Sequence, residues 1–230
     1  MKLPLSSRML ACCAFVEPGD RVADVGCDHG YLGIHLLLDG TARSVIASDI
    51  NPMPLASARR NAAKFGVSDK MTFHMSSGVR HIPHDFDTLV CAGLGGDTMM
   101  SILSDAPWLR DPRYRLILQC QSKRPELRKY LYRHGFTIRR ETLAKDGKFL
   151  YPVMEVVYAP PEEPTPAQYY ITPALLSSGS PLLPEFLDHV LSGLEKTVQG
   201  LTHTCGADLE LYQGILNDIS EWRKEYAHRP

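Results

Sequence analysis

Residues 22–32 read Val-Ala-Asp-Val-Gly-Cys-Asp-His-Gly-Tyr-Leu, and this stretch decides the fold class. A short apolar run over 21–25 predicts a buried strand, and Gly26 and Gly30 predict a turn after it. The residues that follow have helical spacing up to Gly40, so they predict a helix. A strand, a glycine-containing loop and a helix in this order form the first part of a βαβ unit.

The same alternation continues to about residue 158. Further strands are predicted over 44–49, 71–75, 88–92 and 115–120, and further helices over 53–65, 96–103 and 125–135. Two last strands, near 136–144 and 149–158, are joined at Asp146-Gly147, which is a strong hairpin signal. We therefore expect an α/β fold, with a mainly parallel seven-stranded sheet, helices on both faces and an antiparallel hairpin at one edge.

The composition changes near residue 160. Residues 160–184 hold seven of the chain's 17 prolines, which predicts a stiff connector and not a hydrophobic core. Apolar residues then recur at three- or four-residue steps on both sides of Gly206, which predicts two antiparallel helices. We expect a domain over 1–159, a Pro-rich connector over 160–183 and a coiled-coil-like helical hairpin over 184–230.

Charge and cysteine content exclude several classes of protein. The 230 residues carry 25 Lys+Arg and 26 Asp+Glu, a formal net charge of −1, which argues against a polycation that coats nucleic acid through bulk charge. No stretch approaches the roughly 18 apolar residues that span a bilayer, and the N-terminus is a poor signal peptide. The six cysteines form no CxxC pair, and His81 and His84 lack further ligands at metal spacing. We expect a cytoplasmic protein with reduced thiols and no metal.

The loop after the first strand is a candidate ligand site, because ligands of open α/β sheets bind beyond the carboxyl ends of the strands. It lacks the G-x-G-x-x-G fingerprint, and the chain has no G-K-[ST], so neither a dinucleotide nor ATP is well supported. S-adenosylmethionine fits better. Asp24 or Asp28 could bind its ammonium group, the loop N–H groups its carboxylate, and Asp49, at the end of the second strand, its ribose hydroxyls. The alternative is that Asp24 and Asp49 only cap turns.

A second glycine cluster, Ala92-Gly93-Leu94-Gly95-Gly96-Asp97, follows the fourth predicted strand. Three glycines in four residues leave little side-chain bulk, so a substrate could lie flat beside the methyl group of the cofactor. The alternative is a tight turn into a helix that Asp97 caps, and both interpretations are compatible.

Together these motifs resemble the bacterial tRNA (adenine-N1)-methyltransferases that act on adenine 22 in the D-arm of tRNA. The similarity also includes Leu5-Ser6-x-Arg8, Leu116-Ile-Leu-Gln119 and Asp146-Gly147-Lys148, and it extends in order over roughly residues 5–158. It implies a Rossmann-like class I methyltransferase domain, S-adenosylmethionine as donor and tRNA as substrate. One departure follows the third strand, where the family has Gly-Asp-Gly with an acid that faces the adenine amino group and this chain has Ser76-Ser77-Gly78.

Methyl transfer to adenine N1 needs little acid–base help, because the N1 lone pair of the neutral base is free. The protein must position the reactants, exclude water and accept a base extruded from its stack. The residues expected to act on the substrate base are His29, Tyr31, Gly93 and Gly95, although Tyr31 could equally pack on the sheet. The residues expected to bind the cofactor are Arg8, Asp24, Gly26, Cys27, Asp28, Gly30, Asp49, Ile50, Ser76, Ser77, Gly78, Ala92 and Gly93; Arg8 could equally be a solvated or ion-paired side chain.

The charge is unevenly distributed along the chain. Residues 110–150 carry 12 Lys+Arg and four acids, whereas residues 160–230 carry four Lys+Arg and ten acids. We expect tRNA to meet Lys123, Arg124, Arg128, Lys129 and Arg133, and the alternative is a solvated helix face. The favoured function is that of a tRNA adenine-N1 methyltransferase that works as a monomer. The alternatives are a methyltransferase for a small molecule or a protein, and a non-catalytic RNA-binding or scaffold protein.

Overall fold

The computed structural model describes residues 3–201 and 206–227. The chain divides into two compact units, Met1–Pro161 and Glu162–Pro230. Cys205 and most of the expected turn between the two C-terminal helices lie outside the described residues. In the described part of the chain, no helix is long and apolar enough to cross a membrane.

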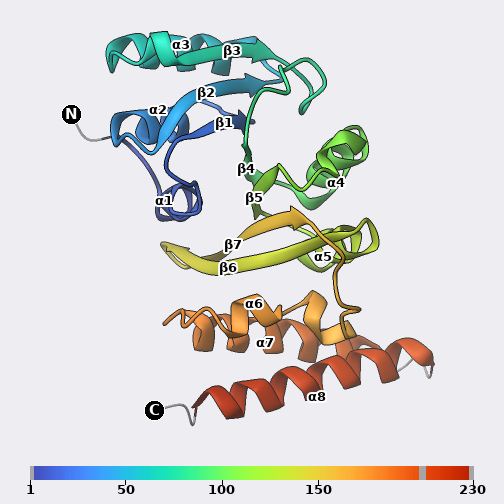
Figure 1. The fold of residues 1–230 in the computed structure, drawn as a ribbon. Helices are drawn as coiled ribbons and strands as arrows, with labels where there is room; N and C mark the ends of the chain where they lie inside the picture. Colours follow the sequence, from blue (N-terminus) through green and yellow to red (C-terminus); the bar gives the residue numbers. More distant parts are fainter. Residues whose placement is uncertain (1–2, 202–205, 228–230) are drawn as a thin grey trace. The chain divides into compact units, whose positions relative to one another are not determined.

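The first unit is built on one mixed sheet (Figure 1). Its strands are β1 (Asp20–Val25), β2 (Ala42–Asp49), β3 (Met71–Met75), β4 (Thr88–Leu94), β5 (Arg115–Cys120), β6 (Phe136–Asp146) and β7 (Phe149–Tyr158). Their order is β3-β2-β1-β4-β5-β7-β6, and β1 to β5 pair in parallel while β7 is antiparallel to both of its neighbours. The predicted fold class, a mainly parallel sheet with an antiparallel hairpin at one edge, is confirmed.

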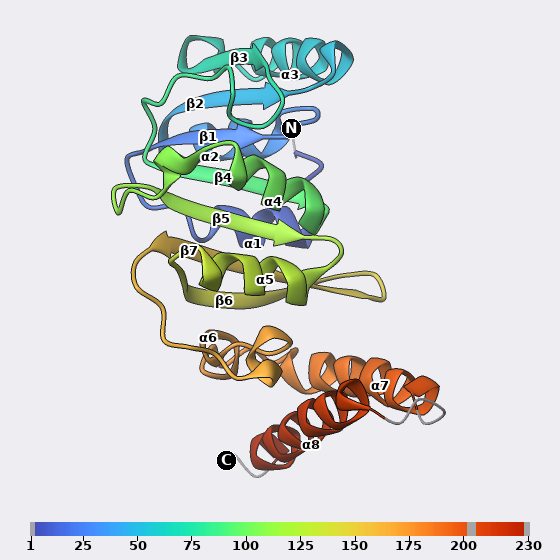
Figure 2. The ribbon, with the colours of Figure 1, turned by 90° about the vertical axis from the view of Figure 1, so that its right-hand side faces the viewer.

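Helices cover both faces of this sheet. They are α1 (Ser7–Cys13), α2 (Tyr31–Leu38), α3 (Pro52–Lys64), α4 (Gly96–Ser104) and α5 (Arg124–Arg133), with single turns η1 (Ser68–Lys70) and η2 (Pro107–Leu109). Figures 1 and 2 show α1, α2 and α3 on one face and α4 and α5 on the other. Helix α2 lies very close to β2, because a Cβ on Gly33 would be 2.7 Å from Cγ1 of Val45.

The middle strands β1, β4 and β5 form the centre of the core. Val22, Ala23, Leu89, Leu116 and Ile117 have no exposed surface, which agrees with parallel strands buried on both faces. Burial of a Val, Leu or Ile side chain stabilises the folded state by about 1.5–3 kcal/mol. These strands therefore give a stable base for the loops at their carboxyl ends.

The expectation that residues 160–183 contain no core is wrong. They form the short helices η3 (Pro166–Tyr169) and α6 (Pro173–Leu176), and Ala167, Ile171 and Leu175 have no exposed surface. Pro166 and Pro173 begin these helices, where the missing N–H would have no partner in any case. The second unit adds α7 (Leu183–Leu201) and α8 (Ala207–Ala227), which pack against each other.

Candidate functional site

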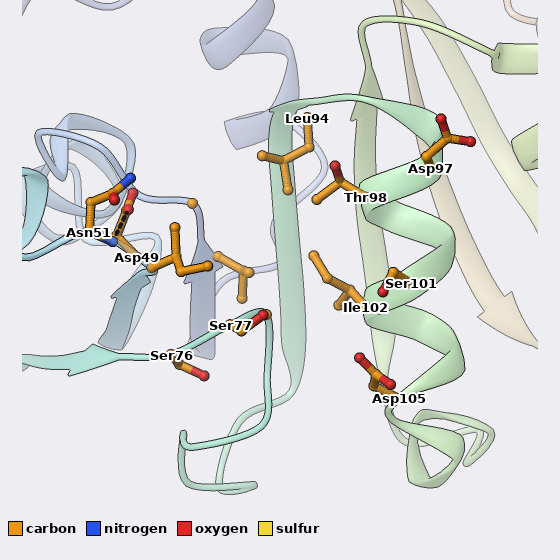
Figure 3. Close-up of a pocket in the computed structure, with 14 residues that line it drawn as sticks. Asp49, Asn51, Ser76, Ser77, Leu94, Asp97, Thr98, Ser101, Ile102 and Asp105 are labelled. Carbon is orange, nitrogen blue, oxygen red and sulfur yellow. Dashed lines mark hydrogen bonds between the residues drawn. The ribbon is translucent and has the colours of Figure 1, made fainter.

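A cavity of about 570 Å³ opens at the carboxyl edge of the parallel strands. One wall consists of the ends of β1, β2 and β3 and their loops, and the opposite wall consists of Leu94 and α4 (Figure 3). The lining residues are Val25, Gly26, Asp49, Ile50, Asn51, Ser76, Ser77, Gly78, Leu94, Asp97, Thr98, Ser101, Ile102 and Asp105. Its volume and its mixture of apolar walls with a few polar groups suit a ligand of nucleoside size.

The loop after β1 is held against the end of β2 by backbone hydrogen bonds. The N–H groups of Gly26 and Cys27 both donate to the carbonyl of Ser48 at 2.9 Å. Gly26 has a φ of 74° and Asp28 a φ of 50°, so the loop turns through the left-handed region. The loop is therefore a rigid turn, as the glycines predict.

Asp49 is the acid that faces the cavity from the end of β2. Its Oδ1 accepts the N–H of Asn51 at 2.9 Å, and its Oδ2 accepts the N–H of Asp28 at 3.3 Å. Each carboxylate oxygen retains a lone pair for a further donor. The carboxylate is thus fixed between two backbone segments and can accept hydrogen bonds from a pair of hydroxyl groups.

Asp24 lies deeper, at the end of β1, and is only 3% exposed. Burial is the main cause that raises the pKa of Asp24 to about 7. The N–H of Gly33 donates to the carboxylate and lowers this pKa, whereas the charges of Asp49 and Asp28 raise it. Its Oδ2 has no hydrogen-bond partner in the structure. A hydrogen-bond donor or a positive charge brought close to this buried carboxyl group would stabilise its ionised form.

Glycine is required at position 93, at the end of β4, because the side chain of Arg8 lies against the backbone there. Gly93 has a φ of 82°, and a Cβ there would be 2.8 Å from Nη1 of Arg8. The same Nη1 donates to Oε1 of Gln119 at 2.9 Å. The guanidinium of Arg8 therefore lies directly on the backbone of Gly93, at the ends of β4 and β5.

The Ser76-Ser77-Gly78 segment forms the floor of the cavity. Oγ of the buried Ser76 accepts the N–H of His81 at 3.0 Å, so this hydroxyl stabilises its own loop. A Cβ on Gly78 would be 2.7 Å from Cγ1 of Ile102, which shows how closely the loop approaches α4. Ser77 is exposed and directed towards the cavity (Figure 3).

The predicted cofactor residues fall into two groups. Gly26, Asp49, Ile50, Ser76, Ser77 and Gly78 line the cavity, whereas Arg8, Asp24, Cys27, Asp28, Gly30, Ala92 and Gly93 are not among its lining residues. Arg8 lies instead on the loop after β4. Gly95, expected to act on the substrate, follows directly on that loop and begins α4 as its N-cap.

Sequence reasoning missed one wall of the cavity. Asp97, Thr98, Ser101, Ile102 and Asp105 come from α4 and its C-cap, at steps of three and four residues that place them on one helix face. The signal was present, because a helix that starts after the loop 92–96 must present one face to the neighbouring loops. Nε and Nη2 of Arg80 both donate to Oδ2 of Asp105, at 3.2 and 2.7 Å.

His29 and Tyr31 lie next to each other at the start of α2. Their ring centroids are 5.9 Å apart, and the side chain of His29 is 53% exposed. Tyr31 is partly buried against the hydrophobic core, which was the alternative weighed for it. His29 is therefore accessible to a ligand, while Tyr31 also has a packing role.

One predicted RNA contact is wrong. Arg128 is only 1% exposed and forms a buried ion pair with Glu141, so it cannot reach a phosphate. Lys123 is exposed, but its Nζ lies 2.6 Å from Oδ2 of Asp97. Lys129 and Arg133 are exposed, and Arg124 is partly buried, which lowers its pKa. A charge count gives the number of acids in a segment but not which cation each acid pairs with, so it could not reveal the pairing of Arg128 with Glu141 or of Lys123 with Asp97.

Comparison with known proteins gives the family. Residues 5–154 match the family model described as a methyltransferase domain. The chain belongs to this methyltransferase family. The match contains the whole cavity and ends within β7, so α6, α7 and α8 lie outside it.

Similar proteins include methyltransferases for RNA and for protein. The chain is 30% identical over 149 residues to the tRNA (adenine(22)-N(1))-methyltransferase of Bacillus subtilis, covering 64% of this chain and 63% of that protein. It therefore aligns with less than two thirds of that relative. It is also 31% identical over 134 residues to the ribosomal protein L11 methyltransferase of Geobacillus thermodenitrificans, covering 57% of this chain and 42% of that protein.

A solved structure resembles the chain along most of its length. A Streptococcus pneumoniae protein, named as a proposed tRNA (m1A22) methyltransferase, superposes with a TM-score of 0.81 at 26% identity, covering 97% of this chain and 100% of that one. Its complex with S-adenosyl-L-methionine gives a TM-score of 0.83 at 24% identity, covering 95% of this chain and 99% of that one. The similarity therefore extends beyond the methyltransferase domain.

The described cysteines of the methyltransferase domain are free and buried. Burial raises the pKa of both Cys12 and Cys91 to about 12, so these thiols stay neutral. Among the described residues, no group of three or more His, Cys, Asp or Glu is placed to hold a metal ion.

Proposed function

We propose that this methyltransferase transfers a methyl group from S-adenosylmethionine to N1 of an adenine in tRNA, with position 22 in the D-arm as its target. The observation that carries the proposal is the cavity at the ends of β1 and β2. In it the carboxylate of Asp49 is held where it could accept hydrogen bonds from a ribose, and the glycine loop 92–96 lies beside it. The tRNA part is supported by the relatives from B. subtilis and S. pneumoniae. A tRNA substrate implies a cytoplasmic enzyme, and we place the reaction in residues 1–159.

The residues present fit S-adenosylmethionine. Asp49 would accept the ribose hydroxyls, and Ile50, Leu94 and Ile102 would flank the adenine ring with apolar surface. The side chain of Ile50 is 63% exposed, which a stacked ring would reduce. Asp105, which also lines the cavity, can accept a hydrogen bond from the adenine amino group, since its Oδ1 has no hydrogen bond among those described.

Asp24 would contribute through charge. The cofactor carries a sulfonium and an ammonium, and a nearby positive charge favours the ionised form of a buried carboxyl whose pKa is about 7. Gly33 already donates its N–H to this carboxylate. Asp24 would therefore stabilise the bound cofactor without lining the cavity itself.

When bound, S-adenosylmethionine supplies an electrophilic methyl carbon, which the lone pair of adenine N1 attacks as the carbon–sulfur bond breaks. We place the base beside the glycine loop, where the Arg8 guanidinium fills the space that a side chain at position 93 would occupy and so fixes the backbone against which the base would lie. His29 and Tyr31 border the same edge of the sheet and would frame the base. No side chain has to remove a proton from N1, so the rate depends on alignment and exclusion of water.

The proposal is tested by transfer of a labelled methyl group to unmodified tRNA transcripts. We expect label in a transcript with adenine 22 and none in a matched transcript with guanine 22. The Asp49→Ala variant should lose both transfer and calorimetric binding of S-adenosylmethionine. Label in ribosomal protein L11 but in no transcript would favour a protein methyltransferase, and no heat with the cofactor would favour a scaffold protein; either result would contradict the proposal.

A further inference from the structure

The tip of the β6–β7 hairpin is docked on the start of α1. Oδ1 of Asp146 accepts the N–H of Ser7 at 2.8 Å, and its Oδ2 accepts the N–H of Arg8 at 3.3 Å. These are N–H groups of the first turn, which have no partner within the helix, and a carboxylate is favoured there. The hairpin tip and the Arg8 backbone are therefore held in one fixed arrangement.

A continuous row of cations and aromatic rings leads from the glycine loop to this tip. The guanidinium of Arg8 lies on Gly93, and its Cζ is 5.9 Å from the ring centroid of Tyr151. The rings of Tyr151 and Phe149 are 6.3 Å apart, and Nζ of Lys148 is 5.4 Å from the ring of Phe149. We call Arg8, Tyr151, Phe149 and Lys148 the hairpin strip.

The outer part of the hairpin strip is rigid and exposed. Asp146 pairs with Phe149 across a two-residue loop, and Gly147 has a φ of 59°, as a tight hairpin turn with glycine at its first central position requires. Phe149 nevertheless leaves 56% of its surface exposed. A single exposed apolar side chain is ordinary on a protein surface, so it is the row that Phe149 forms with Tyr151 and the two cations that indicates an interaction surface.

The position of the hairpin strip points to the substrate. Figure 2 shows the hairpin reaching past the end of β5, on the side where the parallel strands end. Pairing of Leu118 with Met154 places Tyr151 beyond the last paired residues of β5, at about the level of Gln121. The strip thus starts at the proposed place of methyl transfer and runs outward from it.

We propose that the hairpin strip is a stacking surface for an unstacked nucleobase next to the target adenine, with Lys148 directed at the phosphates that flank it. This proposal rests on the proposed RNA substrate. Aromatic faces stack any base, and cations at the two ends of the strip attract the RNA backbone, so this composition matches single-stranded RNA better than an apolar protein partner. An adenine extruded from its stack leaves one face of its neighbour without a stacking partner.

The test is the kinetics of methyl transfer by variants of Phe149. We expect Phe149→Ala to raise the KM for tRNA by roughly tenfold or more, as loss of one stacked base does, while kcat and cofactor binding change little. Phe149→Trp should keep the wild-type KM, and Phe149→Leu should behave as the alanine variant does. Leu38→Ala is the matched control, because Leu38 is also an exposed large apolar residue, at 50%.

A second readout is the fluorescence of 2-aminopurine placed beside the target adenine, which stacking on Phe149 should quench in the wild type but not in Phe149→Ala. If the wild-type enzyme methylates tRNA and Phe149→Ala has the same KM and the same quenching, the hairpin strip is not a stacking surface. If the wild-type enzyme labels no tRNA, the proposed function itself fails.

Discussion

Replacement of Asp24 by asparagine should make the unliganded protein more stable at alkaline pH. The carboxyl of Asp24 is 3% exposed at the end of β1, and burial raises its pKa from 3.8 to about 7. In the unfolded chain the same group ionises near 3.8. Between these two values the native state holds a proton that the unfolded state has lost, so stability falls as the pH rises.

The size of the effect follows from the shift. A difference of about three pKa units, at roughly 1.4 kcal/mol each, amounts to a penalty of about 4 kcal/mol once the pH exceeds the native pKa. Asparagine is uncharged at every pH and has nearly the same shape. The gain in stability of Asp24→Asn over wild type should therefore grow by about 3 kcal/mol between about pH 5 and pH 8 and stay constant above that.

Urea unfolding of both proteins at a series of pH values measures this difference. The matched control is Asp87→Asn, since the hydrogen bond from Arg21 lowers the pKa of Asp87, so this variant should lose stability at neutral pH and lose less in acid. The same Asp24→Asn protein should bind S-adenosylmethionine more weakly than wild type. An Asp24→Asn variant whose stability relative to wild type is independent of pH would refute the reasoning.

Three further experiments test other parts of the structure. Gly78→Ala would place a Cβ 2.7 Å from the wall of α4 and should lower cofactor affinity by calorimetry while the fold is retained. Arg128→Met removes the guanidinium of a buried ion pair with Glu141, so urea unfolding should show a loss of about 3–5 kcal/mol that the additional substitution Glu141→Leu largely restores. Gly93→Ala requires an alanine at a φ of 82° and displaces Arg8, so kcat should fall while cofactor binding by calorimetry stays unchanged.

The fold was predictable because its central strands are short apolar runs bounded by glycine and acid. The strand predicted over 115–120 matches β5, and the helix predicted over 53–65 differs from α3 by one residue at each end. The connector was misjudged, since Pro166 and Pro173 begin short helices instead of preventing them. Proline density alone does not distinguish the first turn of a helix from an extended linker.

The sequence predicted only those parts of the site that lie at the ends of predicted strands and in the loops directly after them. The acid Asp49 and the loop 76–78 were found because strand ends gather at one edge of a parallel sheet. Arg128 was assigned to RNA because Glu141, its partner, lies 13 residues away in another element. Pairings of this kind depend on the packed structure, and so does the contact of Arg8 with Gly93.

The central claim is that adenine N1 in tRNA receives the methyl group. Its most direct test is mass spectrometry of nucleosides from an unmodified tRNA transcript incubated with the enzyme and S-adenosylmethionine carrying a heavy methyl group. We predict heavy 1-methyladenosine at one residue per tRNA, absent when adenine 22 is replaced. A heavy methyl group on another atom or another base, or on no nucleoside at all, would contradict the claim.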